Sequence, residues 1–308
     1  MLAPIIMFAY NRLDTLKKTV NALEKNILAD KSNIIIFSDY AKNIEDQKKV
    51  NQVREYLDEL QNNHGFNSID IRYSQENFGL ARSIINGVSN VIERFGKVIV
   101  LEDDLITSTD FIEYMNEALN FYEDDKRIWS ISGYTFNIKI PKSYNHDVFF
   151  TRRLCSWGWA TWKDRWNLID WEVSDFESFN GNKRYKKSFN MGGRDLSNML
   201  KAQMEGEIDS WAIRSCYSQF KHDMYTVYPV KSKVKNIGFS GSGTHGKKIN
   251  ERKYNIILPK IPTKVVFSQF ELNKKITKSF CNFFISRWRY FLISIKGKLG
   301  NLLKEIWK

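Results

Sequence analysis

Residues 97–111 read KVIVLEDDLITSTDF, and this stretch decides the fold that the sequence predicts. Its first part, Val98 to Leu101, is a continuous apolar run typical of a strand buried on both faces of a sheet. Glu102, Asp103 and Asp104 end the run, and residues 107–110 can then cap a helix that runs onward from residue 111. In an open α/β sheet the carboxyl ends of the strands face the ligand crevice, so we expect the three acids there.

The acidic triplet predicts a metal site. Three adjacent carboxylates repel one another and lose hydration at a strand end, so a cation is their natural partner. Hard oxygen ligands suit Mg²⁺ or Mn²⁺, and such ions usually keep open positions for substrate phosphates. The alternative is a solvated acidic turn that caps the next helix.

Three further apolar segments precede this strand, at residues 3–9, 33–39 and 69–74. Amphipathic helical patterns separate them, with Asn11 as the expected N-cap of the first helix. Strands that alternate with helices of ordinary length predict a right-handed, mostly parallel sheet of the Rossmann type. The fold class is therefore α/β.

Length and cysteine usage limit the protein class. With 308 residues, of which 43% are hydrophobic, the chain can form one large α/β domain with an appendage. Cys155, Cys216 and Cys281 are widely spaced, which favours reduced thiols in the cytosol over a disulfide framework or a zinc site. No basic leader segment precedes the first strand, and no apolar run reaches the ~18–20 residues of a membrane-spanning helix.

The net charge of +12 lies in the C-terminal part of the chain. Residues 1–245 contain equal numbers of basic and acidic side chains, whereas residues 246–308 contain 15 Lys and Arg against 3 Asp and Glu. A nucleic-acid partner would depend on this tail alone, so we expect none.

Polar residues follow the other strands of the predicted sheet. Arg12 follows the first strand, Asp39 ends the second, and Arg82 lies at the start of the helix after the third. Two arginines and a metal suit a diphosphate, because a guanidinium binds phosphate oxygens in a bidentate fork. The Asp39 carboxylate could accept the N3–H of a uracil. For the two arginines, the alternative is a surface charge on a first helical turn.

Four segments together resemble the GT-A-fold glycosyltransferases, and in particular a bacterial form of the N-acetylglucosaminyltransferase I type: APIIMFAYNRLDTLKKTVNAL, IIIFSDY, VIVLEDDLITSTDFIEYM and CSWGWATW. The similarity covers about residues 3–245 in the order of the family. It implies a UDP-sugar donor, with Arg12 and Arg82 on the diphosphate, Asp39 on the uracil and Asp104 on Mn²⁺ (or Mg²⁺). Glu102 and Asp103 are then expected to contact the nucleotide-sugar.

Beyond the acidic triplet, residues 127–134 and 148–153 resemble strands of the mixed, acceptor-facing part of this fold. Five tryptophans follow within fifteen residues, and flat rings of this kind stack on sugar faces. We assign Trp157 and Trp159 to the acceptor, and Gly158 to a close approach of the backbone to the donor. The alternative for the tryptophans is ordinary packing.

Residues 173–203 are polar and poorly patterned, which predicts a mobile loop.

By resemblance to the family, Asp209 is the catalytic base. Its alternative role is the N-cap of the following helix, and Glu207 is the alternative base.

The glycine-serine loop at residues 238–246 carries His245, which we expect as a second metal ligand. A loop histidine without a role is the alternative.

From about residue 274 the chain combines aromatic side chains with nine Lys and Arg. This combination is typical of a helix that lies on an anionic membrane surface, which would place the protein in the cytoplasm at the inner face of the membrane. The alternative is a helix packed on its own domain or on a second subunit in a homodimer.

We expect three parts in the chain: a nucleotide-sugar-binding half of a GT-A domain (residues 1–110), the acceptor-side and catalytic half of the same domain (111–245) and a basic amphipathic extension (246–308). The expected function is metal-dependent, inverting transfer of a hexosyl or N-acetylhexosaminyl group from a UDP-sugar. The acceptor would be a glycan or a lipid-linked molecule of bacterial surface polysaccharide or glycoconjugate synthesis.

A sugar nucleotidylyltransferase is the alternative enzyme, although it would require a glycine-rich motif after the first strand. A non-enzymatic carbohydrate-binding protein would explain the tryptophans but not the charged residues.

Overall fold

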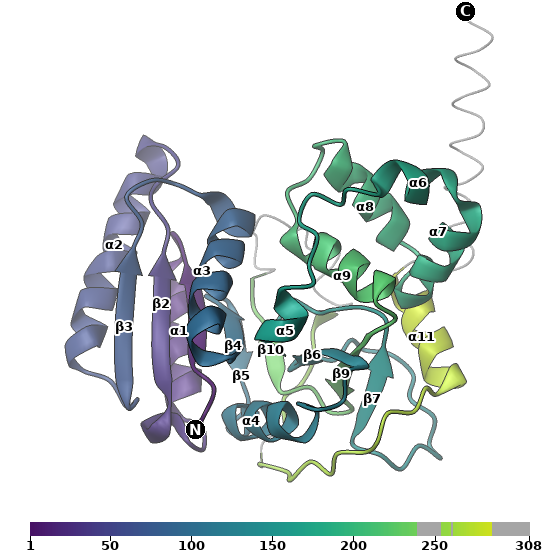
Figure 1. Ribbon diagram of the computed structural model, residues 1–308. Coiled ribbons are helices and arrows are strands. Elements are labelled where there is room, and N and C mark those ends of the chain that lie inside the picture. The colour runs from purple at the N-terminus through teal and green to yellow at the C-terminus, as the bar shows by residue number, and fades with distance from the viewer. Residues whose placement is uncertain (239–253, 260, 285–308) are drawn as a thin grey trace, which may run out of the picture.

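An eight-stranded sheet runs through the molecule, with helices on both of its faces (Figure 1). This computed structural model describes residues 1–238, 254–259 and 261–284. The strand order is β3-β2-β1-β4-β8-β6-β9-β7, and two clusters of buried apolar side chains form the core on the two faces. The prediction of an α/β fold with a mostly parallel sheet is confirmed.

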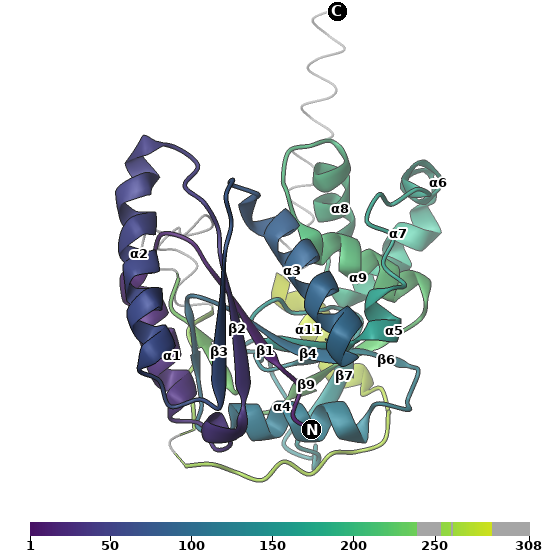
Figure 2. The ribbon, with the colours of Figure 1, turned by 60° about the vertical axis from the view of Figure 1, so that its left-hand side comes forward.

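The first half of the sheet is parallel, as the alternation of strands and helices predicted. Ile5 of β1 pairs with Ile34 of β2 and with Ile99 of β4, in both cases in parallel register. Successive side chains of a strand point to opposite faces, so Met7 packs with α1 and Phe8 packs with α3. Figure 2 shows α1 and α2 on one side of these strands and α3 on the other. The elements of this half are β1 (Ile5–Ala9), α1 (Leu13–Glu24), η1 (Ala29–Lys31), β2 (Asn33–Ser38), α2 (Ile44–Asn62), β3 (Ser68–Tyr73), α3 (Gly79–Phe95) and β4 (Lys97–Glu102).

The second half of the sheet is mixed. Strand β8 pairs antiparallel with β4 and with β6, and β9 then lies parallel to β6 and antiparallel to β7. The strands expected at residues 127–134 and 148–153 are present as β6 and β7. The elements are α4 (Phe111–Phe121), β6 (Ile128–Ser132), β7 (Val148–Thr151), β8 (Trp159–Trp162), α5 (Lys163–Trp166), α9 (Trp211–Lys221) and β9 (Tyr225–Pro229).

The prediction of a mobile loop at residues 173–203 is wrong, because this segment folds into short helices. Phe179, Phe189, Leu196 and Leu200 are buried in the same core cluster as Trp211. Each helix contributes only one or two of these side chains, so no helical period is visible in the sequence. The elements are α6 (Phe176–Gly181), α7 (Lys183–Phe189), η2 (Asn190–Gly192) and α8 (Leu196–Met204).

A two-stranded ribbon that the sequence did not predict follows the acidic triplet. Strand β5 (Leu105–Thr107) pairs antiparallel with β10 (Val234–Asn236). Next to the ribbon, the buried Lys233 ammonium donates to the Asp110 carboxylate at 2.6 Å. The same carboxylate accepts the backbone N–H of Thr263 at 3.0 Å, so the pair also holds a segment from the C-terminal part of the chain.

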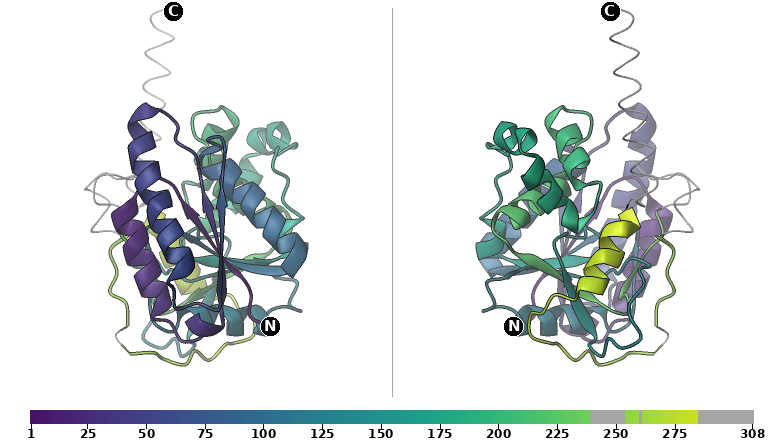
Figure 3. Two further views of the ribbon diagram at one scale, coloured as in Figure 1. Left: turned by 90° about the vertical axis from the view of Figure 1, so that its left-hand side faces the viewer. Right: turned by 90° about the vertical axis from the view of Figure 1, so that its right-hand side faces the viewer.

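That C-terminal segment passes along the edge of the domain and leads into α11 (Lys274–Phe284), which crosses one face of the protein (Figure 3, right). Ile276 and Phe280 of α11 are buried, and the Phe280 ring packs on Tyr228 at 5.2 Å between centroids. The apolar face of α11 therefore packs on its own domain, which is the alternative that we gave for the tail, and binding of the basic residues to a membrane stays a prediction. Residues 285–308 of the expected tail lie outside the described residues. In the part of the chain that the structure describes, no helix is long and apolar enough to cross a membrane.

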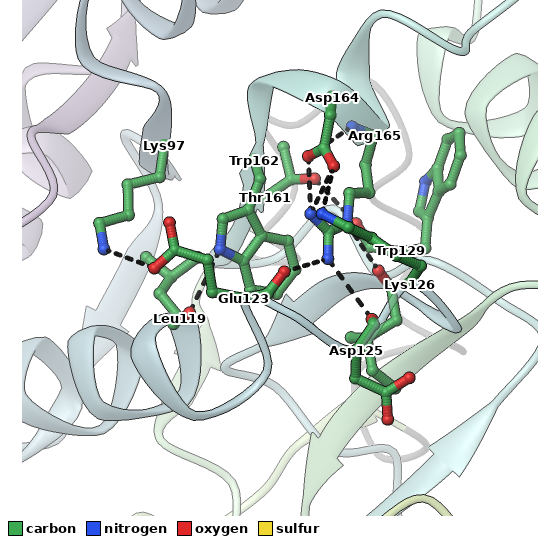
Figure 4. A network of polar contacts seen from close by, with 11 residues as sticks. Lys97, Leu119, Glu123, Asp125, Lys126, Trp129, Thr161, Trp162, Asp164 and Arg165 are labelled. Carbon is green, nitrogen blue, oxygen red and sulfur yellow. Dashed lines mark hydrogen bonds and ion pairs between the residues drawn. The ribbon is translucent and has the colours of Figure 1, made fainter.

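A buried arginine, Arg165, forms a network of hydrogen bonds in the second half of the sheet, at the end opposite the acidic triplet (Figure 4). Arg165 pairs with Asp164 at 2.6 Å and donates to the backbone carbonyls of Glu123 at 2.6 Å and Ile128 at 3.2 Å. Its guanidinium also lies 4.6 Å from the centre of the Trp162 ring. Arg165 therefore joins α5 and β8 to the turn between α4 and β6.

The Lys233–Asp110 pair gives a test of the ribbon's anchoring. Lys233→Met leaves a buried carboxylate without its cation, and we expect a loss of about 3–5 kcal/mol in the free energy of unfolding. The double variant Lys233→Met/Asp110→Asn removes both charges and should lose much less. Urea denaturation of both variants measures the difference, with Lys201→Met in the exposed pair with Glu205 as the control. A single variant as stable as the wild type would contradict the anchoring role.

Candidate active site

The acidic triplet lies in the turn between β4 and β5, where little water reaches it. Asp103 is 2% exposed and Asp104 is 7% exposed. Burial, together with the charges of Asp104 and Asp103, raises the pKa of Glu102 to about 8, although Arg12 opposes this shift. Burial also raises the pKa of Asp103 to about 6, although Arg12 opposes this shift. The raised pKa values show that negative charge on this turn is costly, so a nearby cation favours the ionised carboxylates.

Arg12 supplies a cation to this turn. It follows β1 at the N-terminus of α1, and one terminal nitrogen of its guanidinium donates to Asp104 Oδ2 at 2.7 Å. The other terminal nitrogen donates to Asp103 Oδ1, so a single side chain bridges two carboxylates. The backbone N–H of Tyr10 contacts the remaining oxygen of Asp103 at 3.4 Å. The predicted convergence of Arg12 with the acidic triplet is thus present in the structure.

Gly238 closes this arrangement from the side of β10, and the sequence had not marked it as a site residue. The N–H of Ile237 donates to the Asp104 carbonyl at 2.9 Å. A Cβ atom on Gly238 would lie 2.1 Å from Asp104 Oδ2, so the close approach requires a glycine. The loop that carries His245 continues from this residue, and His245 itself lies outside the described residues. The glycine-rich composition of residues 238–246 was the available signal.

The donor atoms of the turn suit a hard divalent cation such as Mg²⁺ or Mn²⁺. Asp104 Oδ1 is buried and has no hydrogen-bond partner among the described residues. An oxygen of this kind can ligate a cation without losing a bond to the protein. Among these residues no group of three His, Cys, Asp or Glu side chains has the arrangement of a complete metal site. Further ligands would therefore have to come from the substrate, water or the loop after Gly238.

Asp39 lies at the end of β2, as predicted, but its carboxylate is occupied by the start of α3. It accepts the backbone N–H groups of Phe78 at 3.0 Å and Gly79 at 2.9 Å, and the side-chain amide of Asn77 at 3.3 Å. Asp39 therefore fixes the turn that leads into α3. A nucleobase would share this carboxylate with the turn, so the role of Asp39 in base recognition stays a prediction.

Arg82 is not brought to the acidic triplet by any contact within the described part of the chain. Its side chain is exposed on α3, and its guanidinium lies 5.9 Å from the centre of the Phe78 ring. Of the two arginines expected to bind one diphosphate, only Arg12 contacts the acidic triplet in the described part of the chain.

The tryptophan-rich segment mainly forms core. Trp159 is 1% exposed, and its ring stacks on Trp211 at 4.9 Å and on Trp166 at 5.8 Å. The acceptor role expected for Trp159 has no support in this geometry, because the ring is buried and packs against two other rings. Trp157 is half-buried and packs on Tyr134 at 4.7 Å, which leaves it as the candidate for an acceptor contact.

Gly158 is required for the packing of the turn before β8. Its φ is +66°, and a Cβ atom there would lie 2.7 Å from a methyl group of Val234. Its carbonyl accepts the N–H of Gly133 at 2.6 Å. Gly158 thus lies close to β10, and its predicted approach to the donor stays a prediction.

Glu207 and Asp209 are exposed in the segment before α9. Ser210, and not Asp209, is the N-cap of α9, because its hydroxyl accepts the N–H of Ile213 at 3.4 Å. The Asp209 carboxylate lies 3.6 Å from the Arg214 guanidinium and is 69% exposed. The capping role that was the alternative for Asp209 is thus taken by its neighbour, and Asp209 stays available as a base.

A chain of contacts connects this segment to the acidic triplet. Trp211, two residues after Asp209, stacks on Trp159. Trp159 pairs with Val100 across β8 and β4, and Val100 lies two residues before Glu102. The base candidates and the acidic triplet are therefore attached to the same pair of strands.

Comparisons with known proteins were made at the levels of sequence and structure. The sequence model of the GNT-I family matches residues 1–175 of the 308-residue chain. No curated protein matches the chain in sequence. The chain is similar in structure to residues 1–349 of S. aureus TarS, with 10% identity, a TM-score of 0.42 and coverage of 76% of this chain and 60% of that chain. The same fragment in complex with UDP gives the same values.

A further TarS structure has 10% identity and a TM-score of 0.43, with coverage of 76% of this chain and 36% of that chain. The chain thus spans less than two thirds of the length of these neighbours. The family model covers more than half of the chain, and it includes β1, β2, the acidic triplet and the tryptophan-rich segment. The chain therefore belongs to the GNT-I family of glycosyltransferases, as the resemblance of its four segments predicted.

Proposed function

We propose that this protein transfers a hexosyl or N-acetylhexosaminyl group from a UDP-sugar to a hydroxyl of a glycan or lipid-linked acceptor, with inversion at the anomeric carbon. The observation that carries the proposal is the buried acidic turn bridged by Arg12 at the carboxyl edge of a parallel sheet. A ligand at this edge lies where open α/β sheets bind nucleotides. The choice of uridine and the inversion are taken from the resemblance to the family.

The donor would be held by the ends of β1, β2 and β4. Arg12 would pair with the diphosphate, Asp39 would contact the base, and Glu102 and Asp103 would contact the nucleotide-sugar. Arg82 would reach the diphosphate only by a movement of its exposed side chain. Asp104 and His245 would hold Mn²⁺ or Mg²⁺, which supplies positive charge for the leaving diphosphate when bound.

The acceptor would approach from the second half of the sheet. Asp209, or Glu207 in its place, would remove the proton of the attacking hydroxyl as the new glycosidic bond forms and the bond to the diphosphate breaks. Both carboxylates are exposed, and the helix that follows them packs through Trp211 on Trp159 of β8, the strand beside β4. Trp157 would stack on the acceptor, and the Gly158 turn would place it. Residues 1–110 would thus form the nucleotide-sugar half and residues 111–245 the acceptor half.

The basic C-terminal part, residues 246–308, would bring the enzyme to the inner face of an anionic membrane. Residues 285–308 contain six Lys and Arg and one Glu. Lys274, Lys275 and Lys278 of α11 are exposed and add to the same charge. Lipid-linked acceptors of surface polysaccharide or glycoconjugate synthesis would be available there. Contact between two copies through the tail, in a homodimer, is the alternative use of this segment.

The metal role of Asp104 is tested by Asp104→Asn, which keeps the shape of the side chain and removes its charge. We expect turnover to fall by roughly 10²–10³-fold, because charge on the leaving diphosphate is then poorly compensated. Release of UDP from a panel of UDP-sugars, titrated with Mn²⁺, measures the effect. Asp70→Asn on β3 is the matched control, since Asp70 is exposed and far along the chain from the turn. Wild-type turnover that persists in EDTA would argue against the metal.

The base is identified by comparing Asp209→Asn with Glu207→Gln. Loss of a general base lowers turnover by roughly 10²–10⁴-fold, and we expect this loss in Asp209→Asn. Its melting temperature should not change, because Ser210 caps α9. Ser210→Ala is the converse control, with an expected cost of about 1 kcal/mol in stability and little change in turnover. Should Glu207→Gln alone lose turnover, Glu207 is the base.

Two truncations separate membrane binding from packing. A chain that ends at Phe284 keeps α11 and should lose binding to anionic vesicles, since each basic residue near such a surface contributes on the order of 1 kcal/mol. A chain that ends at residue 273 also loses the buried Phe280 and should melt at a lower temperature. Vesicle co-sedimentation at low and high salt measures the binding. Unchanged vesicle binding after the first truncation would contradict the membrane role of residues 285–308.

A further inference from the structure

The Arg12 guanidinium is bonded to the two carboxylates that a cation on the acidic turn would use. Its two terminal nitrogens are used by Asp104 Oδ2 and by Asp103 Oδ1, which belong to adjacent residues. The side chains of Asp103 and Asp104 are 3% and 10% exposed, so water does little to screen them. A divalent cation on the same turn would lie beside a guanidinium of the same sign of charge. The two cations therefore compete for the same carboxylates.

The two carboxylate oxygens of Asp104 differ in their partners, so Arg12 and a divalent cation could each use one of them. Oδ2 is bonded to Arg12, whereas the buried Oδ1 has no partner within the described residues. A buried carboxylate oxygen without a partner is costly, so binding of a cation to Oδ1 would be favourable. Departure of Arg12 would free a second oxygen on Asp104 and one on Asp103. The turn would then offer three carboxylate oxygens from two residues.

Arg12 is placed so that a diphosphate could attract it away from the turn. Its side chain is 22% exposed, in contrast to its two partners. It lies at the start of α1, a helix of 12 residues that begins without a capping side chain. Anions are stabilised at such a position, and a guanidinium binds phosphate oxygens as well as carboxylate oxygens.

We propose that Arg12 is an exchangeable counter-ion of the acidic turn. Without nucleotide it neutralises Asp103 and Asp104, and when the diphosphate of the donor enters it moves to the phosphate oxygens and releases both carboxylates to the metal. Metal binding at the turn is therefore suppressed until the nucleotide is present. The proposal rests on the proposed function, since it assumes a diphosphate donor and a divalent cation at this edge of the sheet.

The decisive measurement is the affinity for Mn²⁺ without nucleotide, followed by the electron paramagnetic resonance signal of free Mn²⁺. Arg12→Met removes the competing charge and keeps an unbranched apolar side chain of similar length. We expect this variant of the full chain to bind Mn²⁺ at least tenfold more tightly than the wild type. Arg94→Met is the control for a lost positive charge, because Arg94 is exposed at the end of α3 and lies over Phe95. It should bind Mn²⁺ as the wild type does.

A second variant covers the case in which Arg12→Met fails to fold. Arg12→Lys keeps the positive charge but cannot bridge two carboxylates with a planar fork, so its Mn²⁺ affinity without nucleotide should lie above that of the wild type. Inorganic pyrophosphate, the probe for the diphosphate alone, should bind more weakly to the Arg12 variants than to Arg94→Met. Circular dichroism in the near ultraviolet shows whether each variant is folded.

The outcomes separate this proposal from the proposed function. If folded Arg12 variants bind Mn²⁺ no more tightly than the wild type, Arg12 is a permanent structural partner of the turn and the exchange is overturned. UDP binding by the wild type would leave the proposed function intact in that case. If the wild type binds neither UDP nor pyrophosphate, with or without Mn²⁺, the proposed function itself fails.

Discussion

The carboxylates of Asp103 and Asp104 are buried directly after a strand, and their need for a nearby cation organises the residues around the end of β4. Arg12 can meet it because β1 and β4 are parallel neighbours, with Phe8 opposite Glu102 in the register. The residues that follow the two strands therefore emerge at the same edge of the sheet. A single guanidinium then bridges Asp103 and Asp104, and the backbone N–H of Tyr10 reaches Asp103 from the same loop. The negative charge of the turn and the start of α1 are thus parts of one arrangement.

The two halves of the sheet are joined by aromatic packing directly behind this turn. Trp159 pairs with Val100 and stacks on Trp211, so the helix that follows Asp209 is held against the strand that precedes Glu102. Rings at this position bury a large apolar area, and stacked pairs contribute about 0.5–1.5 kcal/mol beyond that area. The buried tryptophans thus connect the two halves of the sheet, which accounts for the occurrence of several of them in one core cluster.

The sequence was sufficient for the parallel half of the fold, because buried strands and amphipathic helices each repeat with their own period over many residues. It was also sufficient for the acidic turn and Arg12, whose positions follow from strand ends alone. It failed for α6 to α8, where each short helix has one or two buried side chains and no period can develop. It misjudged Trp159 and Phe280, since an aromatic side chain has the same appearance in a sequence whether it contacts a ligand, a membrane or the core. Gly238 was missed because the constraint on it comes from Asp104, more than a hundred residues earlier in the chain.

The C-terminal part of the chain supports the site from a distance. Strand β10 ends just before Gly238, and its partner β5 begins just after Asp104, so the ribbon fixes both sides of the turn. Lys233 and Asp110 hold the base of the ribbon, and Thr263 donates to the same carboxylate. The segment that contains Thr263 continues into α11, whose Phe280 is buried among Tyr228 and Phe149. Contacts of the C-terminal part of the chain thus lie both at the base of the ribbon, through Thr263 and Asp110, and on the second half of the sheet, through Phe280. The ribbon in turn lies beside Asp104, so this part of the chain packs around the elements that position the acidic turn.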